Sequence, residues 1–367
     1  MKFHIVKRDN CPLWKKCCFY LAAVVIALLL GAVLLIALGV DPVAYYTRMF
    51  TMGTIGNKIA YKVWINYLKD FVPLALVSVA LSLAFKMRFW NIGGEGQFIL
   101  GAISAAFVAF KAGPVLPNAA TLLLMCLAAM VVAGVYGLFV AALNVKFGTN
   151  ETLMTLMLNY IALYILIFLS EDKGEWNFFL DPSSLRPVFA SFAKIVSFPS
   201  IPMAGKFSLN VCVIFTFLIG ILIYIYLKYT KQGYEIAVVG DSAGTARYAG
   251  MKVNTIVLRT VFLSAALIGL AAAFKVGTAG ILSTAITDDV GWTGIIVAWL
   301  SQLNTAVIFV VSALICMLHY GSTVAAATFS QVDSSFANML QGVILFLVLA
   351  ADFYTRFRIV PIKKGGK

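Results

Sequence analysis

Runs of uncharged apolar residues divide this sequence, and the first of them covers residues 17–40. A helix of about 20 apolar residues is long enough to cross the hydrocarbon core of a bilayer. Only 12% of the 367 residues are charged and 62% are hydrophobic, whereas soluble domains carry about 25% charged residues. The alternation that marks β-barrel strands is not visible, so the spans are predicted to be helices. The chain is therefore predicted to be an all-α, polytopic membrane protein.

The charges at the ends of these runs predict how the chain crosses the membrane. Both termini are basic, which places them in the cytoplasm by the positive-inside rule. Residues 41–70 mix aromatic and basic residues, and we expect them to form an interfacial helix. The prediction is a helical bundle of about ten membrane segments. The net charge of +13 follows from this bias toward cytoplasmic cations and does not indicate nucleic-acid binding.

Two blocks of similar length, residues 71–170 and 255–352, each contain an interrupted apolar segment near their start. The blocks are expected to cross the membrane in opposite senses. Broken helices in paired inverted repeats are typical of transporters with a central site. An external loop, 171–206, and a cytoplasmic loop, 228–254, lie between them. We predict a single transmembrane domain over residues 1–367.

The stretch KMRFWNIGGEGQFILG, residues 86–101, places glycines and polar residues between two apolar segments. Unwound backbone is tolerated at membrane depth only where protein buries it or where it lines a watery cavity. A carboxylate there, Glu95, marks a candidate functional site. Two other interpretations stay open: a cytoplasmic turn with a solvated Glu95, and a Glu95 that caps the half-helix following it.

Two further segments carry helix-capping signals. Asn150 and Glu151 open the span that begins near residue 153, where an N-cap and an acidic first turn suit the helix dipole. Asp241 and Ser242 could cap a short helix over residues 243–248 in the cytoplasmic loop. That helix could be a docking element or an ordinary connector.

Signatures of catalysis are absent from the sequence. It contains no GxxxxGK[ST] phosphate loop and no HExxH metal motif, and its six cysteines suggest no disulfide framework. We therefore predict no catalytic residues, no metal site and no cofactor. If transport by this chain uses ATP, a partner subunit has to hydrolyse it.

Four motifs occur in the order NIGGEGQFILGA, NETLMTLMLNYIA, VGDSAGTARYAGMKVN and GIIVAWLSQLN. With them, about residues 60–355 resemble the permease subunits of bacterial ABC importers of the ribose and branched-chain amino acid type. The chain is most similar to the branch that imports nucleosides, purines being favoured. The resemblance implies a bacterial inner-membrane protein with three partners. These are an ATP-binding ABC subunit, a second permease chain that often differs in sequence, and an external substrate-binding lipoprotein of the basic-membrane-protein type.

The resemblance also assigns residues. The stretch GDSAGTARYAG corresponds to the coupling helix that contacts the ATPase subunit, and its residues are Gly240, Asp241, Arg247, Tyr248 and Gly250. Those expected to line or brace the substrate pathway are Asn91, Glu95, Gln97, Asn150, Glu151, Asn159, Trp292 and Asn304.

The sequence departs from the family pattern at three positions. Thr293 and Thr305 stand where an Asp and a Pro are common, and Lys275 replaces a carboxylate that is often present in the seventh segment. These departures suggest that the chain is the more degenerate half of a heterodimer or prefers another solute.

Other functions stay open on the sequence. The substrate could be a simple sugar or another small polar solute. An ion-coupled secondary transporter would use Glu95, Glu151, Asp288 and Asp289 as ion ligands or relay groups. An intramembrane enzyme is disfavoured because neither His4 nor His319 has a nearby metal set.

Overall fold

The computed structural model describes residues 3–7, 12–57, 59–192, 196–203, 206–333 and 335–361. In this part of the chain, nine helices are long and apolar enough to cross a membrane, and the shorter helix α11 (Val290–Leu300) is also apolar. The all-α, polytopic class predicted from the sequence is therefore confirmed. The chain forms two compact units, Met1–Ala60 with Met317–Lys367, and Tyr61–Cys316.

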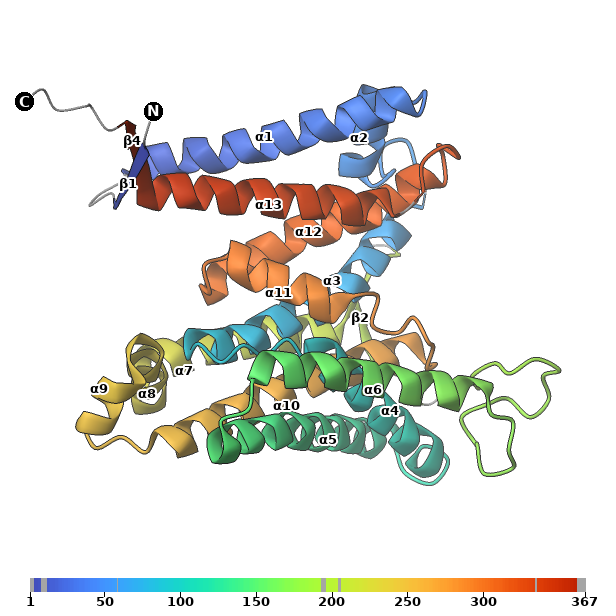
Figure 1. Cartoon of the computed structure of the whole chain (residues 1–367). Helices are drawn as coiled ribbons and strands as arrows, with labels where there is room; N and C mark the ends of the chain where they lie inside the picture. Colours follow the sequence, from blue (N-terminus) through green and yellow to red (C-terminus); the bar gives the residue numbers. More distant parts are fainter. Residues whose placement is uncertain are drawn as a thin grey trace, which may run out of the picture. The chain divides into compact units, whose positions relative to one another are not determined.

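The first unit joins the two ends of the sequence. Its elements are β1 (Phe3–Lys7), α1 (Leu13–Ala37), α2 (Pro42–Thr51), the end of α12 (Thr305–Ala326), α13 (Phe336–Arg356) and β4 (Phe357–Pro361). Helices α1 and α13 pack along one another, and β1 pairs antiparallel with β4 (Figure 1). Tyr45 is fully buried in this unit, with its hydroxyl 2.7 Å from the Ser322 hydroxyl and its ring edge-on to Phe336. The two strands bring the described ends of the chain together at one end of the unit.

The second unit contains most of the spans. Its elements are α3 (Ala60–Lys86), α4 (Gly94–Ala112), α5 (Asn118–Phe147), α6 (Glu151–Glu171), β2 (Ser200–Pro202), β3 (Ser208–Asn210), α7 (Val211–Tyr229), α8 (Lys231–Asp241), α9 (Ala243–Tyr248), α10 (Val253–Ala279), α11 and the start of α12. Helices α4, α5 and α10 pack against one another. Gly269 lies so close to the Ala129 carbonyl that a Cβ there would collide with it. Small residues allow this close approach between membrane helices.

The loops of the second unit lie at its two ends, with α8 and α9 at one end and the green loop after α6 at the other (Figure 1). The ammonium group of Lys173 holds the latter loop by donating to the carbonyls of Ser184 (3.1 Å) and Leu185 (2.6 Å). In the same loop, hydrogen bonds from the Ser183 hydroxyl and amide hold the pKa of the partly exposed Asp181 below its ordinary value.

The segment 41–70 differs from the sequence prediction. Only α2 is a separate helix there, and residues 60–70 already belong to α3. The helix extends past the charged Asp70 because that carboxylate accepts a hydrogen bond from the Lys275 ammonium at 2.6 Å. Tyr67 is also anchored, since its hydroxyl donates to the Ala313 carbonyl at 2.8 Å. Long-range partners therefore allow residues 60–70 to form the first turns of α3, although local composition predicts that the span starts at residue 71.

The Asp70–Lys275 pair gives a testable prediction. The two side chains are 33% and 17% exposed, and the pair joins α3 to α10. We expect Lys275→Met to lower the free energy of unfolding, because it leaves a partly buried carboxylate unpaired. The loss should lie between the ~1 kcal/mol of an exposed pair and the ~3 kcal/mol of a buried one. Thermal unfolding in detergent measures it, and adding Asp70→Asn should restore most of the loss. A double variant as unstable as Lys275→Met would contradict the pairing.

Candidate functional site

The chain leaves α3 through a tight C-terminal turn. Arg88 has a left-handed backbone with φ of 59°, and the Phe89 amide donates back to the Ala84 carbonyl at 3.1 Å. This is the hydrogen-bond pattern of a Schellman cap. The turn places Phe89 inside the protein and Trp90 at its surface. It aims the chain into the polar segment, which we define as residues 91–97.

Two buried amides close the polar segment on itself. Asn91 and Gln97 are almost fully buried and exchange two hydrogen bonds, each 3.1 Å long. The Asn91 Oδ1 atom also accepts from the Gly93 amide at 3.1 Å. Buried polar groups are costly unless they are paired. These two side chains therefore brace the backbone of the segment, and neither has a large surface to offer a solute.

Asn159 of α6 satisfies two further backbone groups of the segment. Its Oδ1 atom accepts from the Gly96 amide at 2.8 Å, and its Nδ2 atom donates to the Ile92 carbonyl at 2.9 Å. A Cβ at Gly96 would lie 2.9 Å from that Oδ1 atom, so the position has no room for a side chain. The amide of Asn159 thus replaces the hydrogen bonds that a regular helix would supply at this break.

Glu95 bridges two broken helices. It lies in the first turn of α4 and is 9% exposed, and its Oε2 atom accepts a hydrogen bond from the Gly291 amide at 2.8 Å. Gly291 is in the first turn of α11, whose N-cap residue Asp289 makes no side-chain cap bond. A carboxylate at a helix N-terminus satisfies free amides and suits the helix dipole. Glu95 therefore caps α11, a helix far along the chain from the one that contains it.

A cavity of about 340 Å³ opens beside Glu95, and we call it the central cavity. Its lining residues are Glu95, Ile99, Asn159, Tyr160, Leu163, Thr284, Ala285, Thr287, Asp288, Asp289 and Trp292. Asp288 and Asp289 both adopt left-handed backbone conformations where the chain turns into α11. No Lys, Arg or His occurs among these described lining residues. The cavity thus offers hydrogen-bond acceptors and two half-exposed aromatic rings, Tyr160 and Trp292.

The structure divides the predicted pathway residues among separate places. Asn91, Glu95, Gln97, Asn159 and Trp292 gather at the polar segment and the central cavity. Tyr160 also lines the cavity, and nothing in its local sequence singles it out.

Three of the predicted residues lie elsewhere. Asn150 is the N-cap of α6 and accepts from the Leu153 amide at 3.1 Å, as its sequence context predicts. Glu151 accepts from Asn144 at 3.0 Å and lines a different cavity, of about 370 Å³, beside α8. Asn304 lines an apolar cavity of about 420 Å³ between α7 and α12.

The loop over residues 228–254, which we call the coupling loop, contains two helices. Helix α9 has the predicted bounds, and the Ser242 hydroxyl accepts from the Thr245 amide at 3.2 Å as its cap. Helix α8 before it was not predicted. Ala246 anchors α9 in the protein, whereas Arg247 is exposed and Tyr248 is 97% exposed.

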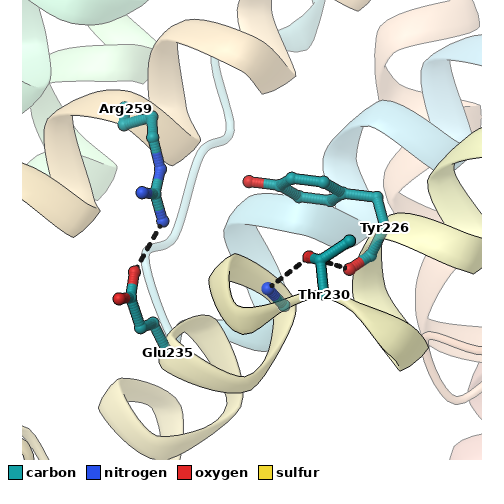
Figure 2. A network of polar contacts seen from close by, with 5 residues as sticks. Tyr226, Thr230, Glu235 and Arg259 are labelled. Atoms are coloured by element: carbon teal, nitrogen blue, oxygen red, sulfur yellow. Dashed lines mark hydrogen bonds and ion pairs between the residues drawn. The ribbon is translucent and has the colours of Figure 1, made fainter.

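Polar contacts fix α8 in place (Figure 2). The Thr230 hydroxyl caps α8 by accepting from the Gly233 amide at 3.1 Å, and it donates to the Tyr226 carbonyl at 2.6 Å. Glu235 of α8 forms an ion pair with Arg259 of α10 at 3.0 Å, as Figure 2 shows. Gly240 sits directly on the Lys86 carbonyl at the end of α3, where a Cβ would collide. The coupling loop is thus an ordered element that carries exposed side chains.

A polytopic helical bundle with a cavity at broken helices is the architecture of a membrane transport protein. Residues 63–349 match the family described as "Branched-chain amino acid transport system / permease component". The chain belongs to this family and is a permease subunit of the ABC transporter type.

Curated relatives of known name cover most of the chain. A glucose ABC transporter permease protein of Haloferax volcanii is 28% identical, covering 96% of this chain and 92% of the relative. A guanosine ABC transporter permease protein of Bacillus subtilis is also 28% identical, covering 94% and 96%. A nucleoside ABC transporter permease protein of Lactococcus lactis is 26% identical over 82% of each chain. The resemblance to the nucleoside branch is therefore confirmed, and a sugar permease is equally similar.

Proposed function

We propose that this chain is the transmembrane subunit of an ATP-driven importer that moves nucleosides, with purines favoured, into a bacterial cell. The central cavity carries this proposal. Carboxylate and amide oxygens can accept hydrogen bonds from ribose hydroxyls, and Trp292 and Tyr160 offer rings for a flat base. The guanosine and nucleoside permeases among the relatives support the same substrate class. A simple sugar is the alternative solute within this function.

The remaining parts of the importer follow from the same proposal. The exposed Arg247 and Tyr248 on α9 contact an ATP-binding subunit, which hydrolyses ATP. A second permease chain of different sequence completes the pathway, and an external lipoprotein delivers the solute. Both termini and the coupling loop face the cytoplasm of a bacterium, consistent with their cations.

Copurification tests this function directly. The chain is expressed with its neighbouring genes, purified in mild detergent and assayed for ATPase activity. We expect an ATPase to copurify and to be lost in the double variant Arg247→Glu/Tyr248→Ala, because both side chains are exposed and neither supports the fold. Lys206→Glu, a charge change in the loop at the other end of the unit, is the matched control and should retain the ATPase. Purification of a folded wild-type chain with no ATPase would contradict the proposal.

The second candidate is an ion-coupled secondary transporter. Three carboxylates, Glu95, Asp288 and Asp289, line one cavity, and intramembrane carboxylates often carry coupling ions. Proteoliposomes that contain this chain alone distinguish the two candidates. Uptake of guanosine or glucose on a proton or sodium gradient, without ATPase, would favour this one.

A further inference from the structure

Residues 87–90 follow α3 directly, and we call them the connector because they join the coupling loop to the polar segment. Met87 and Phe89 are each 5% exposed and belong to one buried apolar cluster. The same cluster contains Ile236 and Val239 of α8 and Ala246 of α9. Side chains of the connector are therefore packed against both helices of the coupling loop.

The backbone of α8 also rests on the start of the connector. Gly240 contacts the Lys86 carbonyl and lies close to the Met87 Cα atom. Protein interiors are densely packed and transmit strain. A displacement of α8 and α9 would therefore change the contacts of Met87 and Phe89, which also line the cavity of about 370 Å³ beside α8.

The connector leads at once to the central cavity. Two residues beyond Phe89, Asn91 is locked to Gln97 by two hydrogen bonds, and the polar segment they enclose contains Glu95. Glu95 lines the cavity and caps α11 through the Gly291 amide. The contacts from α9 to the cavity are thus continuous.

A second route leaves the coupling loop through α10, which contributes no residue to the described lining of the central cavity. The Glu235–Arg259 ion pair joins α8 to α10 (Figure 2). Movement along this route would affect the cavity indirectly, through the packing of α10 against α4 or through the loop after α10.

We propose that Phe89 is a positioning residue that transmits movement of the coupling loop to the polar segment and so to the shape of the central cavity. This inference rests on the proposed function, because an ATPase has to move the coupling loop. Phe89 does not line the cavity, so it acts through Asn91 and Glu95 and not on the solute.

The test measures the cavity without requiring the solute. In the full complex, the six native cysteines are replaced by Ala, and Thr284→Cys places a thiol at an exposed position in the cavity lining. The labelling rate by a maleimide is compared with and without ATP and vanadate. We expect a change of about tenfold in this parent, and of less than about twofold when Phe89→Ala is added.

Two matched variants distinguish a loss of transmitted movement at Phe89 from a general loss of packing in the apolar cluster. Ile256→Ala removes buried apolar volume from the same cluster on α10, outside the connector, and should keep the response. Phe89→Leu retains a large apolar side chain and should also keep it. A Phe89→Ala complex that retains its ATPase and responds like the parent would overturn the inference. A parent that binds ATPase but shows no ATP-dependent labelling would overturn it as well, whereas a parent without ATPase would overturn the proposed function itself.

Discussion

Replacing Glu95 with Ala is expected to lower both the yield of folded protein and its thermal stability, whereas Glu95→Gln should keep most of both. The amide oxygen of Gln can still accept from the Gly291 amide, but Ala leaves that amide unsatisfied in a buried position. An unsatisfied buried donor costs about 1–3 kcal/mol, and the lost side-chain volume adds a cavity term. Unfolding temperatures in detergent and the yield of monodisperse protein measure the difference.

A transport assay on the Glu95 variants distinguishes a structural role of Glu95 from contact with the solute. If Glu95 acts mainly as the cap of α11, Glu95→Gln should change transport only mildly. The control is Glu175→Ala, the same chemical change at an exposed site in the loop after α6, which should leave stability unchanged. Normal assembly of both Glu95 variants with transport abolished in each would show that the carboxylate serves the pathway and not the cap.

Local features of this site could be predicted from the sequence. The glycines and polar residues at 91–97 indicate a break between spans, and the structure has irregular backbone between α3 and α4. The bounds of α9 follow from Ser242 and Gly250, since a hydroxyl cap and a residue with φ of 76° end a helix on either side. These signals are local because each acts within a few residues of the chain.

Long-range pairing could not be predicted in the same way. The Glu95–Gly291 hydrogen bond joins residues 196 positions apart, and only the packing of α4 against α11 brings them together. For the same reason, Glu151 shares a motif with the cavity residue Asn159 but lines another cavity, and Asn304 lines a third. Helix α3 was predicted too short because its charged Asp70 has a partner on α10. Polar residues in a span reveal that a partner exists, but not which one.

The hydrogen bond between Lys275 and Asp70 explains why position 275 departs from the family pattern. Where the family pattern often has a carboxylate, Lys275 faces the carboxylate Asp70 at 2.6 Å. The position is 17% exposed and does not belong to the described lining of the central cavity. The substitution therefore joins two helices, and it gives no reason to expect a different solute.

Two glycines of the coupling loop, Gly240 and Gly244, should respond in opposite ways to Ala. In a helix interior, Ala is ordinarily more stable than Gly by about 0.5–1 kcal/mol. Gly244, the second residue of α9, has room for a Cβ, which would meet only the Ser242 hydroxyl, at 3.6 Å. At Gly240, a Cβ would collide with the Lys86 carbonyl, and overpacking of this kind costs about 1–3 kcal/mol.

We therefore expect Gly240→Ala to displace α8 from the end of α3 and, with it, the exposed face of α9. The unfolding temperature should fall. The amount of copurified ATPase should also fall, because Arg247 and Tyr248 would be displaced from the positions in which they contact the ATP-binding subunit. Gly244→Ala, four residues away, should match or exceed the wild type in both measurements. If Gly240→Ala retains the full amount of ATPase while losing stability, then the contact of Gly240 with the Lys86 carbonyl supports only the fold. If both variants behave alike, the close contact at Gly240 has no role in positioning the coupling loop.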